Sequence, residues 1–501
     1  MSVTGVGVTS SLIVQSLGDM RSQLADLQRQ LGTGKKSTTY AGLGLDRGLA
    51  VSLNAKLAAI NGYADTVTQV GVRIGMQQTA LSQIDSIGKT VKSSTLTQPF
   101  DVDGTGQTTT QRAAMSQLDQ ILGVLNTPAG DRYLFSGRAG DKPATDTLDH
   151  ILNGDGARAG LKQLIAQRNQ ADLGTNGLGR LQAPSVSGSQ VTLSEETPPT
   201  VFGMKLASVT SLNGATVTGP TGSPASVSVN FTSNPNPGDA TTFAFNMPDG
   251  TQQKLTLTAT TNSPPGPGEF TIGTLTTDTA NNFQAALSAG VQQIAASTLP
   301  AASSMAAAND FFNVVAGQPP MRVAGPPFDT ATSLVAGTPA NTVTWYTGEM
   351  GTDSARGTAV AKVDDALTVA YGARANEQAI RSTIANIALY AVSTFSPSDP
   401  NAQAKFAALS QRVGDGLSPQ NGQQSVQDIE AELAFAQTTM NDAKTRQQQS
   451  QGMLQGMLDG VEQAPPEEVG AQILALQTRL QASLQTTSML YQLSIVNYIS
   501  P

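Results

Sequence analysis

The sequence predicts a mainly α-helical coiled-coil rod, formed by paired N- and C-terminal helices, with β-containing (α+β) lobes in the middle of the chain. Apolar residues recur at helical spacing over long stretches at both ends. One of these stretches, residues 49–92, would form a helix of roughly 60–65 Å at 1.5 Å per residue, which suits a rod better than a compact core. Between the ends, short segments alternate apolar and polar residues, as half-buried strands do.

The N-terminal helix is predicted over residues 10–31, where the apolar spacing follows a 4-3-4-3-4 pattern typical of a coiled-coil seam. Gly32 and Gly34 follow the last apolar residue and favour a helix end there. A loop to about Arg47 and the long second helix come next. The apolar positions of the first helix are Ile13, Leu17, Met20, Leu24, Leu27 and Leu31.

Two helices are predicted at the C-terminal end, over residues 425–460 and 465–501. Pro466 followed by Glu467 and Glu468 is typical of a helix N-terminus, because the acidic side chains meet its positive dipole end. We expect these helices to pack on the N-terminal ones and on other copies of the chain. Their apolar positions are Ile429, Leu433, Met440, Leu454 and Met457 in the first, and Ile473, Leu476, Leu480, Leu484, Tyr491, Ile495 and Tyr498 in the second.

The middle of the chain is divided by changes in composition. A third helix is expected at residues 110–126, a short strand within residues 130–137, and one short helix near residues 161–167. Strands are then expected at residues 227–231, 243–247 and 255–259, with a turn at 248–250, followed by helices at 283–294 and 305–315. Further strands are predicted at 342–347, 358–363 and 367–371, and helices around 380–387 and 401–413. The predicted segments are 1–137, 138–190 (mixed connector), 191–315 (inserted α+β lobe), 316–340 (Pro/Gly-rich connector), 341–400 and 401–501.

Composition excludes several classes of function. With 37 acidic and 29 basic residues, the net charge is −8. No basic stripe is present that could neutralise the phosphates of a nucleic acid. The chain has no cysteine, which excludes disulfides and thiol chemistry. No cleavable signal and no run of about 20 apolar residues is visible, so neither cleavage nor a membrane partner is expected.

Four motifs are candidate sites of chemistry. Residues 34–37 (GKKS) resemble the end of a phosphate-binding loop, but Arg29 stands where that motif needs glycine. Residues 101–106 (DVDGTG) resemble a calcium loop, but Arg112 occupies the position of the bidentate acid. His150 is the only histidine, and residues 187–189 (SGS) lie in a loop, not in a strand–turn–helix context. We therefore predict no catalytic, cofactor-binding or metal-binding residue.

Several segments resemble the bacterial flagellin superfamily. Residues 31–36 (LGTGKK) and 48–52 (GLAVS) look like the N-terminal flagellin signature, although residues 43–47 (LGLDR) replace its usual Asp-Asp-Ala-Ala run. Residues 130–137 (GDRYLFSG), 345–349 (WYTGE) and 493–499 (LSIVNYI) are most similar to the branch of hook-associated protein 3, which joins the hook to the filament. The segment from about 226 to 312 resembles an insertion found in alphaproteobacterial flagellins.

The resemblance implies a secreted, non-enzymatic structural subunit of the extracellular flagellum. Its terminal helices would form the core of a helical or ring assembly, and the subunit would leave the cell by type III export without cleavage. The implied partners are other copies, neighbouring hook-associated proteins and flagellin, and an export chaperone on the C-terminal helices.

Two alternatives stay open on the sequence alone. The chain could be a filament flagellin of the same fold, or an exported enzyme whose coiled-coil arms carry an activity in the 191–315 lobe. The apolar seams could also serve only as intramolecular core, although their length and their position at both ends favour assembly.

Overall fold

The computed structural model describes residues 4–97 and 99–499, with side chains for 12–97, 99–490 and 492. Long helices from the N-terminal part and the C-terminal part are in contact, and the central region contains β-sheets, so the predicted mixed α+β class is confirmed. The chain forms two compact units. The helical unit comprises residues 1–69, 362–368 and 439–501, and the central unit comprises residues 70–361 and 369–438.

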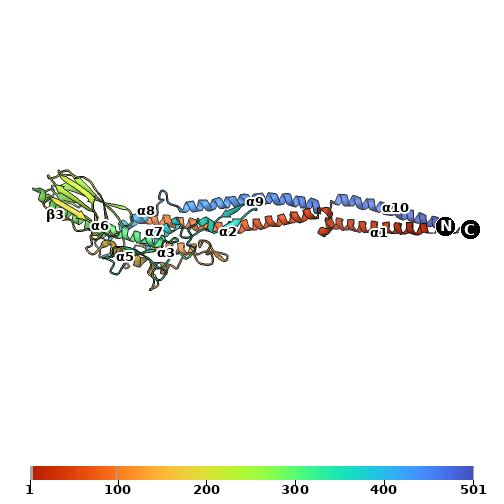
Figure 1. Cartoon of the computed structure of the whole chain (residues 1–501), viewed down its shortest axis with the longest axis horizontal. Helices are drawn as coiled ribbons and strands as arrows, with labels where there is room; N and C mark the ends of the chain where they lie inside the picture. Colours follow the sequence, from red (N-terminus) through yellow and green to blue (C-terminus); the bar gives the residue numbers. More distant parts are fainter. Residues whose placement is uncertain (1–3, 98, 500–501) are drawn as a thin grey trace. The chain divides into compact units, whose positions relative to one another are not determined.

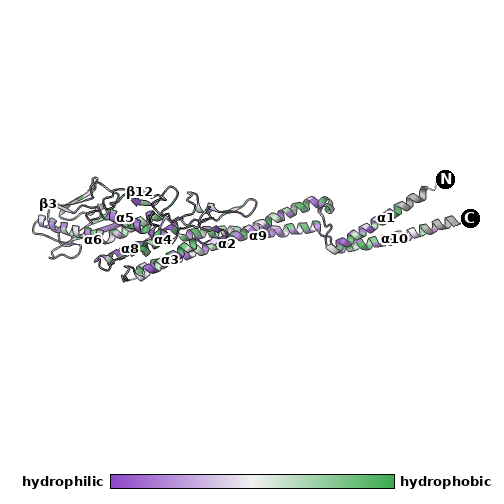
Figure 2. Cartoon of the chain, turned by 90° about the horizontal axis from the view of Figure 1, so that it is seen from below, coloured by the Kyte–Doolittle hydropathy of each residue, from purple (hydrophilic) through white to green (hydrophobic). Residues whose placement is uncertain are grey.

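In the helical unit, two long helices from opposite chain ends lie side by side (Figures 1 and 2). These are α1 (Thr4–Thr33) and α10 (Pro466–Ile499), which confirms both predicted terminal helices. The loop expected after α1 contains a 3₁₀ helix, η1 (Tyr40–Asp46). The unit also holds the start of α2 (Arg47–Thr97) and the end of α9 (Val426–Glu462).

The segment that follows α1 is hydrogen-bonded to the segment between α9 and α10. The backbone N–H of Lys36 donates to the Glu462 carbonyl at 2.7 Å, and that of Ala464 donates to the Gly34 carbonyl at 2.9 Å. Gly34 has a φ of +69°, which a side chain would strain, so glycine suits this helix end. These two hydrogen bonds satisfy backbone groups that follow α1 and flank the break between α9 and α10, where the helices themselves no longer pair them.

Next to this pairing, α2 and α9 form a small core of their own. Ala50, Leu53 and Leu57 of α2 are buried against Leu458 of α9, with Leu454 packed beside them. These residues recur every three to four positions, which is why the two helices meet along one face.

In the central unit, α7 (Gln378–Val392) is surrounded by α3 (Thr109–Leu125), α6 (Thr276–Phe312) and α8 (Ala402–Gly416). Most of α7 is buried, including Ile380, Ile384 and Ile387. The shorter helices are α4 (Leu148–Asn153), α5 (Leu161–Leu173) and the 3₁₀ helix η2 (Ala355–Thr358). The predicted helices at 110–126, 380–387 and 401–413 are thus confirmed.

Two four-stranded sheets form the β-rich part of the central unit (Figure 1). One has the order β10-β9-β8-β5, with β10 parallel to β9 and the other pairs antiparallel; the second, β3-β4-β7-β6, is antiparallel throughout. The strands are β3 (Ser185–Ser187), β4 (Gln190–Ser194), β5 (Lys205–Val209), β6 (Ala215–Thr221), β7 (Ser226–Phe231), β8 (Ala240–Asn246), β9 (Gln252–Thr260) and β10 (Glu269–Thr271).

The core of this region lies between the sheets and α6, which contacts strands of both. Phe283 is fully buried at its centre, with ring centroids 5.4 Å from Phe231 and 5.1 Å from Phe270. The alternation predicted for β7 and β9 is confirmed, whereas in β8 Ala244 is buried together with Phe243 and Phe245. Asp249 and Gly250 lie in the turn between β8 and β9.

Two predictions in this region were wrong. The helices expected at 283–294 and 305–315 are one helix, because α6 continues through Pro300. A proline removes one backbone hydrogen bond. Here, however, the eight residues directly after Pro300 are all buried, and several of them are alanines with high helix propensity. Ser304 Oγ also donates to the Pro300 carbonyl at 2.7 Å. The strand expected at 342–347 is absent from the described chain; Thr342 and Tyr346 make only isolated bridges.

The remaining strands are each two or three residues long and pair two by two. Residues 130–137 were expected to hold one strand, but the structure has β1 (Pro128–Ala129) paired with β2 (Arg132–Tyr133). The connector 316–340 holds a hairpin of β11 (Met321–Val323) and β12 (Leu334–Ala336). The strands predicted at 358–363 and 367–371 are β13 (Val360–Lys362) and β14 (Thr368–Ala370).

Candidate assembly interface and motif cluster

On α1, the predicted seam residues face α10 but are only partly covered. Ile13, Leu17, Met20, Leu24 and Leu27 are half-buried, whereas Leu31 is 47% exposed. One helix cannot cover the seam of another completely, because each seam residue in a fully packed core touches neighbours on several sides. The α1 seam therefore keeps apolar surface that a further helix could bury.

On α10, burial decreases along the predicted seam. Leu476 is buried at 7% exposure, Ile473 and Leu480 are half-buried, and Leu484 is 45% exposed. The predictions for Tyr491, Ile495 and Tyr498 lie outside the residues whose side chains are described, as does the C-terminal motif 493–499. Of the described seam residues on this helix, Leu484 is thus the most accessible.

The α9 seam residues divide into two groups. Ile429, Leu433 and Met440 are at most 1% exposed, so the chain itself covers them and another copy could not reach them without rearrangement. Leu454 is half-buried and Met457 is 47% exposed.

Sequence reasoning missed a second set of exposed apolar side chains on α1 and α10, because they lie outside the seam. Single exposed apolar residues are common on any protein, but a series along paired helices is typical of an interaction surface. All but Met489 stand directly next to a seam position, which is their only signal in the sequence. They are Leu12 (59% exposed), Val14 (64%), Leu474 (67%), Met489 (61%) and Leu490 (54%).

In the central unit, the two motifs at 130–137 and 345–349 meet, although the sequence separates them widely. The backbone N–H of Glu349 donates to the Ser136 carbonyl at 3.0 Å. Arg138 Nη1 donates to Glu349 Oε1 at 2.6 Å, and the Arg138 backbone N–H donates to Glu349 Oε2 at 2.8 Å. The motifs therefore form one cluster, the motif cluster, held by backbone and charged hydrogen bonds.

Trp345 and Tyr346 anchor this cluster in the core. Both are fully buried, and Trp345 Nε1 donates to the Phe312 carbonyl at 2.9 Å while the rings lie 5.5 Å apart. Burial raises the pKa of Tyr346, whose hydroxyl has no hydrogen-bond partner among the described residues. The cluster is thus tied to the end of α6 by an aromatic group that fills the core.

The segment that resembled a phosphate-binding loop has partners within the chain. Lys36 Nζ donates to the Gly460 carbonyl at 3.0 Å, and Lys35 Nζ lies 3.6 Å from the Glu462 carboxylate. In the segment that resembled a calcium loop, Asp103 accepts from the Thr105 backbone at 2.8 Å and forms an ion pair with Arg112. The arginine at the twelfth position thus supplies the positive charge that a cation would bring.

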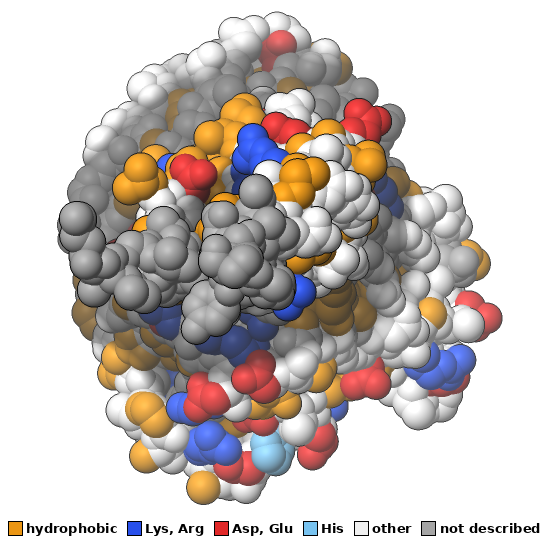
Figure 3. Space-filling model, turned by 90° about the vertical axis from the view of Figure 1, so that its right-hand side faces the viewer, with side chains coloured by type: hydrophobic (Ala, Val, Ile, Leu, Met, Phe, Trp, Pro, Cys, Tyr) orange, Lys and Arg blue, Asp and Glu red, His pale blue; other side chains and the backbone are white. Residues whose placement is uncertain are grey.

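The single histidine lies on the surface with an acidic neighbour. His150 Nδ1 is 3.1 Å from Asp146 Oδ1, and the histidine in Figure 3 lies beside acidic side chains. The serines at 187 and 189 flank the turn between β3 and β4. Across the part of the chain that the structure describes, no group of three or more His, Asp or Glu side chains could hold a metal ion.

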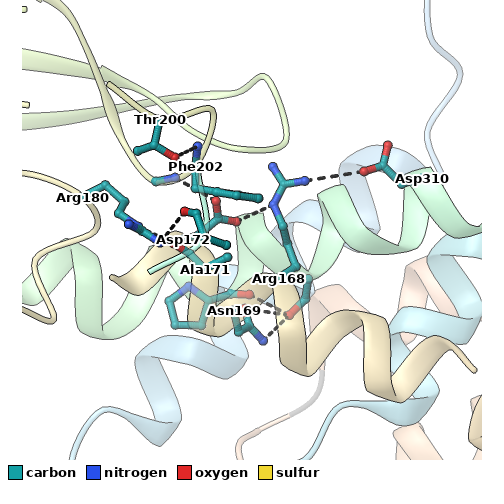
Figure 4. A network of polar contacts seen from close by, with 12 residues as sticks. Arg168, Asn169, Ala171, Asp172, Arg180, Thr200, Phe202 and Asp310 are labelled. Carbon is teal, nitrogen blue, oxygen red and sulfur yellow. Dashed lines mark hydrogen bonds and ion pairs between the residues drawn. The ribbon is translucent and has the colours of Figure 1, made fainter. Parts of the chain in front are cut away.

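A buried ionic network beside α5 has no signal in the sequence pattern (Figure 4). Arg168 Nε donates to Asp172 Oδ2 at 2.8 Å, and the Gly203 backbone N–H donates to Asp172 Oδ1 at 2.7 Å. Arg180 donates to the carbonyls of Ala171 at 2.5 Å and Ala331 at 2.9 Å. The network links α5 to the segments that hold Arg180, Gly203 and Ala331. Charges buried this deeply are costly unless paired.

No protein-family model matches the chain, and the curated proteins contain no significant match to it. Among the described helices, none has a stretch that is long and apolar enough to cross a membrane.

Proposed function

We propose that the chain is a structural subunit of the bacterial flagellum, a hook-associated protein that joins the hook to the filament through self-assembly of its terminal helices. The observation that carries the proposal is the pairing of α1 with α10, which leaves large apolar side chains of both helices exposed. Helices with an uncovered apolar series gain free energy by packing against further helices, at about 25 cal/mol for each Å² buried.

The motifs support the same proposal. Residues 31–36 and 48–52 resemble the flagellin signature, and residues 130–137 and 345–349 resemble the hook–filament junction branch. The last two segments contact each other through Glu349 and Ser136. In this proposal the subunit is secreted by type III export, acts outside the cell, and has no enzymatic activity or cofactor.

The proposed partners follow from the same helices. Other copies of the chain would cover the apolar residues of α1 and α10 in a ring or helical assembly. Hook-associated proteins and flagellin would be the neighbours along the axis, and an export chaperone would bind the C-terminal helices before assembly.

A filament flagellin of the same fold is the second candidate. The segment from about 226 to 312 favours it, because this segment resembles an insertion of alphaproteobacterial flagellins and contains strands of both four-stranded sheets. An exported enzyme with its activity in that region is a remote alternative. It requires hydrolytic activity that a single polar substitution in the region abolishes.

A deletion strain separates the first two candidates. Loss of a junction protein should leave bare hooks and release flagellin into the medium. An attached filament of altered shape would instead favour the filament flagellin. Export is measured separately, by detecting the full-length chain in the medium of the complemented strain.

Assembly itself is tested with substitutions on α10. Leu484→Asp should leave the circular dichroism of the monomer unchanged and prevent polymers in sedimentation, because Leu484 is exposed at 45%. The matched control is Gln485→Asp, which adds the same charge at a neighbouring exposed position and should still assemble. Normal assembly of Leu484→Asp would refute the role of this surface.

A further inference from the structure

A pocket of about 460 Å³ lies in the central unit, and its lining residues belong neither to the two motifs of the motif cluster nor to α1 and α10. Its walls come from the end of α6, the first turns of α7, the end of α8, the turn between β8 and β9, and the loop after α8. Its volume lies within the range of about 300–1,000 Å³ in which proteins bind small molecules. Its lining is mostly polar, with Asn313, Gln378 and Gln423 among the amides.

Arg381 is the unpaired cation of this pocket. Its guanidinium donates to the Asn376 carbonyl at 3.4 Å, and no carboxylate of the described residues lies within 4 Å of it. Burial lowers the pKa of Arg381, with no acidic neighbour offsetting the effect. A half-buried guanidinium without an anion loses hydration and gains no ion pair in return.

The other charges at the pocket are already engaged or solvated. Arg412 Nε donates to Asp249 at 2.7 Å, and Asp310 lies 3.5 Å from Arg168. Asp415 is exposed at the rim. The acidic residues around the pocket disfavour a highly charged anion such as phosphate, whereas one carboxylate matches the one unpaired guanidinium.

Asn386 supplies a second unpaired group. It is 3% exposed and lines the pocket, and its Nδ2 donates to the Ser382 carbonyl at 2.8 Å. Its Oδ1 has no hydrogen-bond partner among the described residues. A Cβ on Gly416 would lie 2.2 Å from this oxygen, so glycine keeps the space beside it open. An acceptor left unpaired in this way commonly meets a ligand or water donor.

We propose that this pocket binds a small organic carboxylate that also carries hydroxyl groups, such as a sugar acid. Arg381 would hold the carboxylate through paired N–H donors, and the amides would bind the hydroxyls. This site is independent of the assembly function, because its residues lie outside α1 and α10.

The test uses the full chain and D-galacturonate as the probe, with D-galactose and inorganic phosphate as comparisons. Galacturonate should raise the thermal midpoint in a saturable way, and galactose and phosphate should not. Arg381→Gln should weaken galacturonate binding at least tenfold by calorimetry, and Arg381→Lys should weaken it less, because lysine keeps the charge and loses the paired geometry.

The matched control is Arg21→Gln, which removes an exposed arginine of α1 and should leave binding unchanged. Urea unfolding without ligand shows whether each variant is folded. The proposal is overturned if galacturonate gives no saturable shift, if phosphate acts equally well, or if Arg381→Gln binds normally. It is also overturned if Arg381→Gln changes only self-association, since an acidic side chain of a second copy would then be the occupant.

Discussion

Arg138 and Glu349 form an ion pair at 2.6 Å across 211 positions of the sequence. Glu349 is 17% exposed, and its second oxygen accepts the backbone N–H of Arg138 at 2.8 Å. The carboxylate therefore fixes both the side chain and the backbone that follow Gly137, whose φ of +64° turns the chain at this point. This pair makes one cluster of the two motifs.

Glu349→Ala should lower the thermal midpoint of the central unit by a few degrees, because the backbone N–H and the guanidinium of Arg138 both lose the mostly buried carboxylate that accepts from them. The matched control is Asp353→Ala, which removes the other carboxylate near Arg138. Asp353 is 65% exposed and lies 3.2 Å away, so its loss should have little effect. Differential scanning calorimetry measures both, and equal shifts would contradict the role given to Glu349.

The single tryptophan provides a local probe. Trp345 is fully buried, so its fluorescence should shift to the red when the central unit unfolds. Trp345→Ala should destabilise this unit by about 3–5 kcal/mol, as truncation of large buried aromatic side chains does. Trp345→Phe should cost less, because it keeps a ring against Phe312 and loses only the indole N–H and part of the volume. Circular dichroism in urea compares the variants, and a smaller loss for alanine would refute this packing.

The ionic network predicts unequal effects of its two acidic residues. Asp172→Ala should cost about 3–5 kcal/mol, because it leaves the nearly buried Arg168 without its close partner and the Gly203 N–H without an acceptor. Asp310→Ala is the matched control, since this carboxylate is 35% exposed and 3.5 Å from Arg168. Its effect should be well under half as large. Urea unfolding followed by Trp345 fluorescence measures the free energy of unfolding of both variants. Similar losses of stability for Asp172→Ala and Asp310→Ala would contradict the network.

Sequence patterns predicted the elements whose stability depends on local spacing. The helices α1 and α10, the alternation of β7 and the glycine after α1 were all readable, because each depends on neighbours along the chain. The continuity of α6 through Pro300 was not readable, because burial against α5, α7 and α8 overrides the local cost of proline.

In the candidate sites, too, the sequence pattern predicts only what local spacing determines. The contact between Glu349 and Arg138 joins segments from distant parts of the chain, and spacing says nothing of such pairs. Arg381 had no distinguishing sequence pattern either, since only the burial around it and the charges engaged elsewhere make it unpaired. For the α9 seam, the pattern located Ile429 and Leu433 correctly on an apolar face, but only the fold shows that the chain itself covers them.

Two buried tyrosines predict a loss of stability at alkaline pH. Burial raises the pKa of Tyr346 and of Tyr390 above the ordinary value near 10. Below about pH 10 both hydroxyls are protonated in the folded and unfolded states, so their contribution does not change with pH. Above it, the unfolded chain loses these protons first, and the free energy of unfolding falls as pH rises towards the folded pKa.

Lys205 acts in the opposite direction, because burial lowers its pKa and stability rises with pH between that value and 10.5. Lys205 contributes equally in the wild type and in a tyrosine variant, so the difference between their free energies of unfolding reports the tyrosine alone.

Tyr346→Phe should leave the free energy of unfolding near pH 8 almost unchanged, since the hydroxyl that it removes has no partner. It should also reduce the loss of stability at alkaline pH. Tyr390→Phe should also reduce that fall but lower stability near pH 8, because it loses the 2.8 Å hydrogen bond to Thr110. Urea midpoints from Trp345 fluorescence at about pH 8 and about pH 11 measure both effects, and parallel pH profiles for the wild type and Tyr346→Phe would refute the assignment.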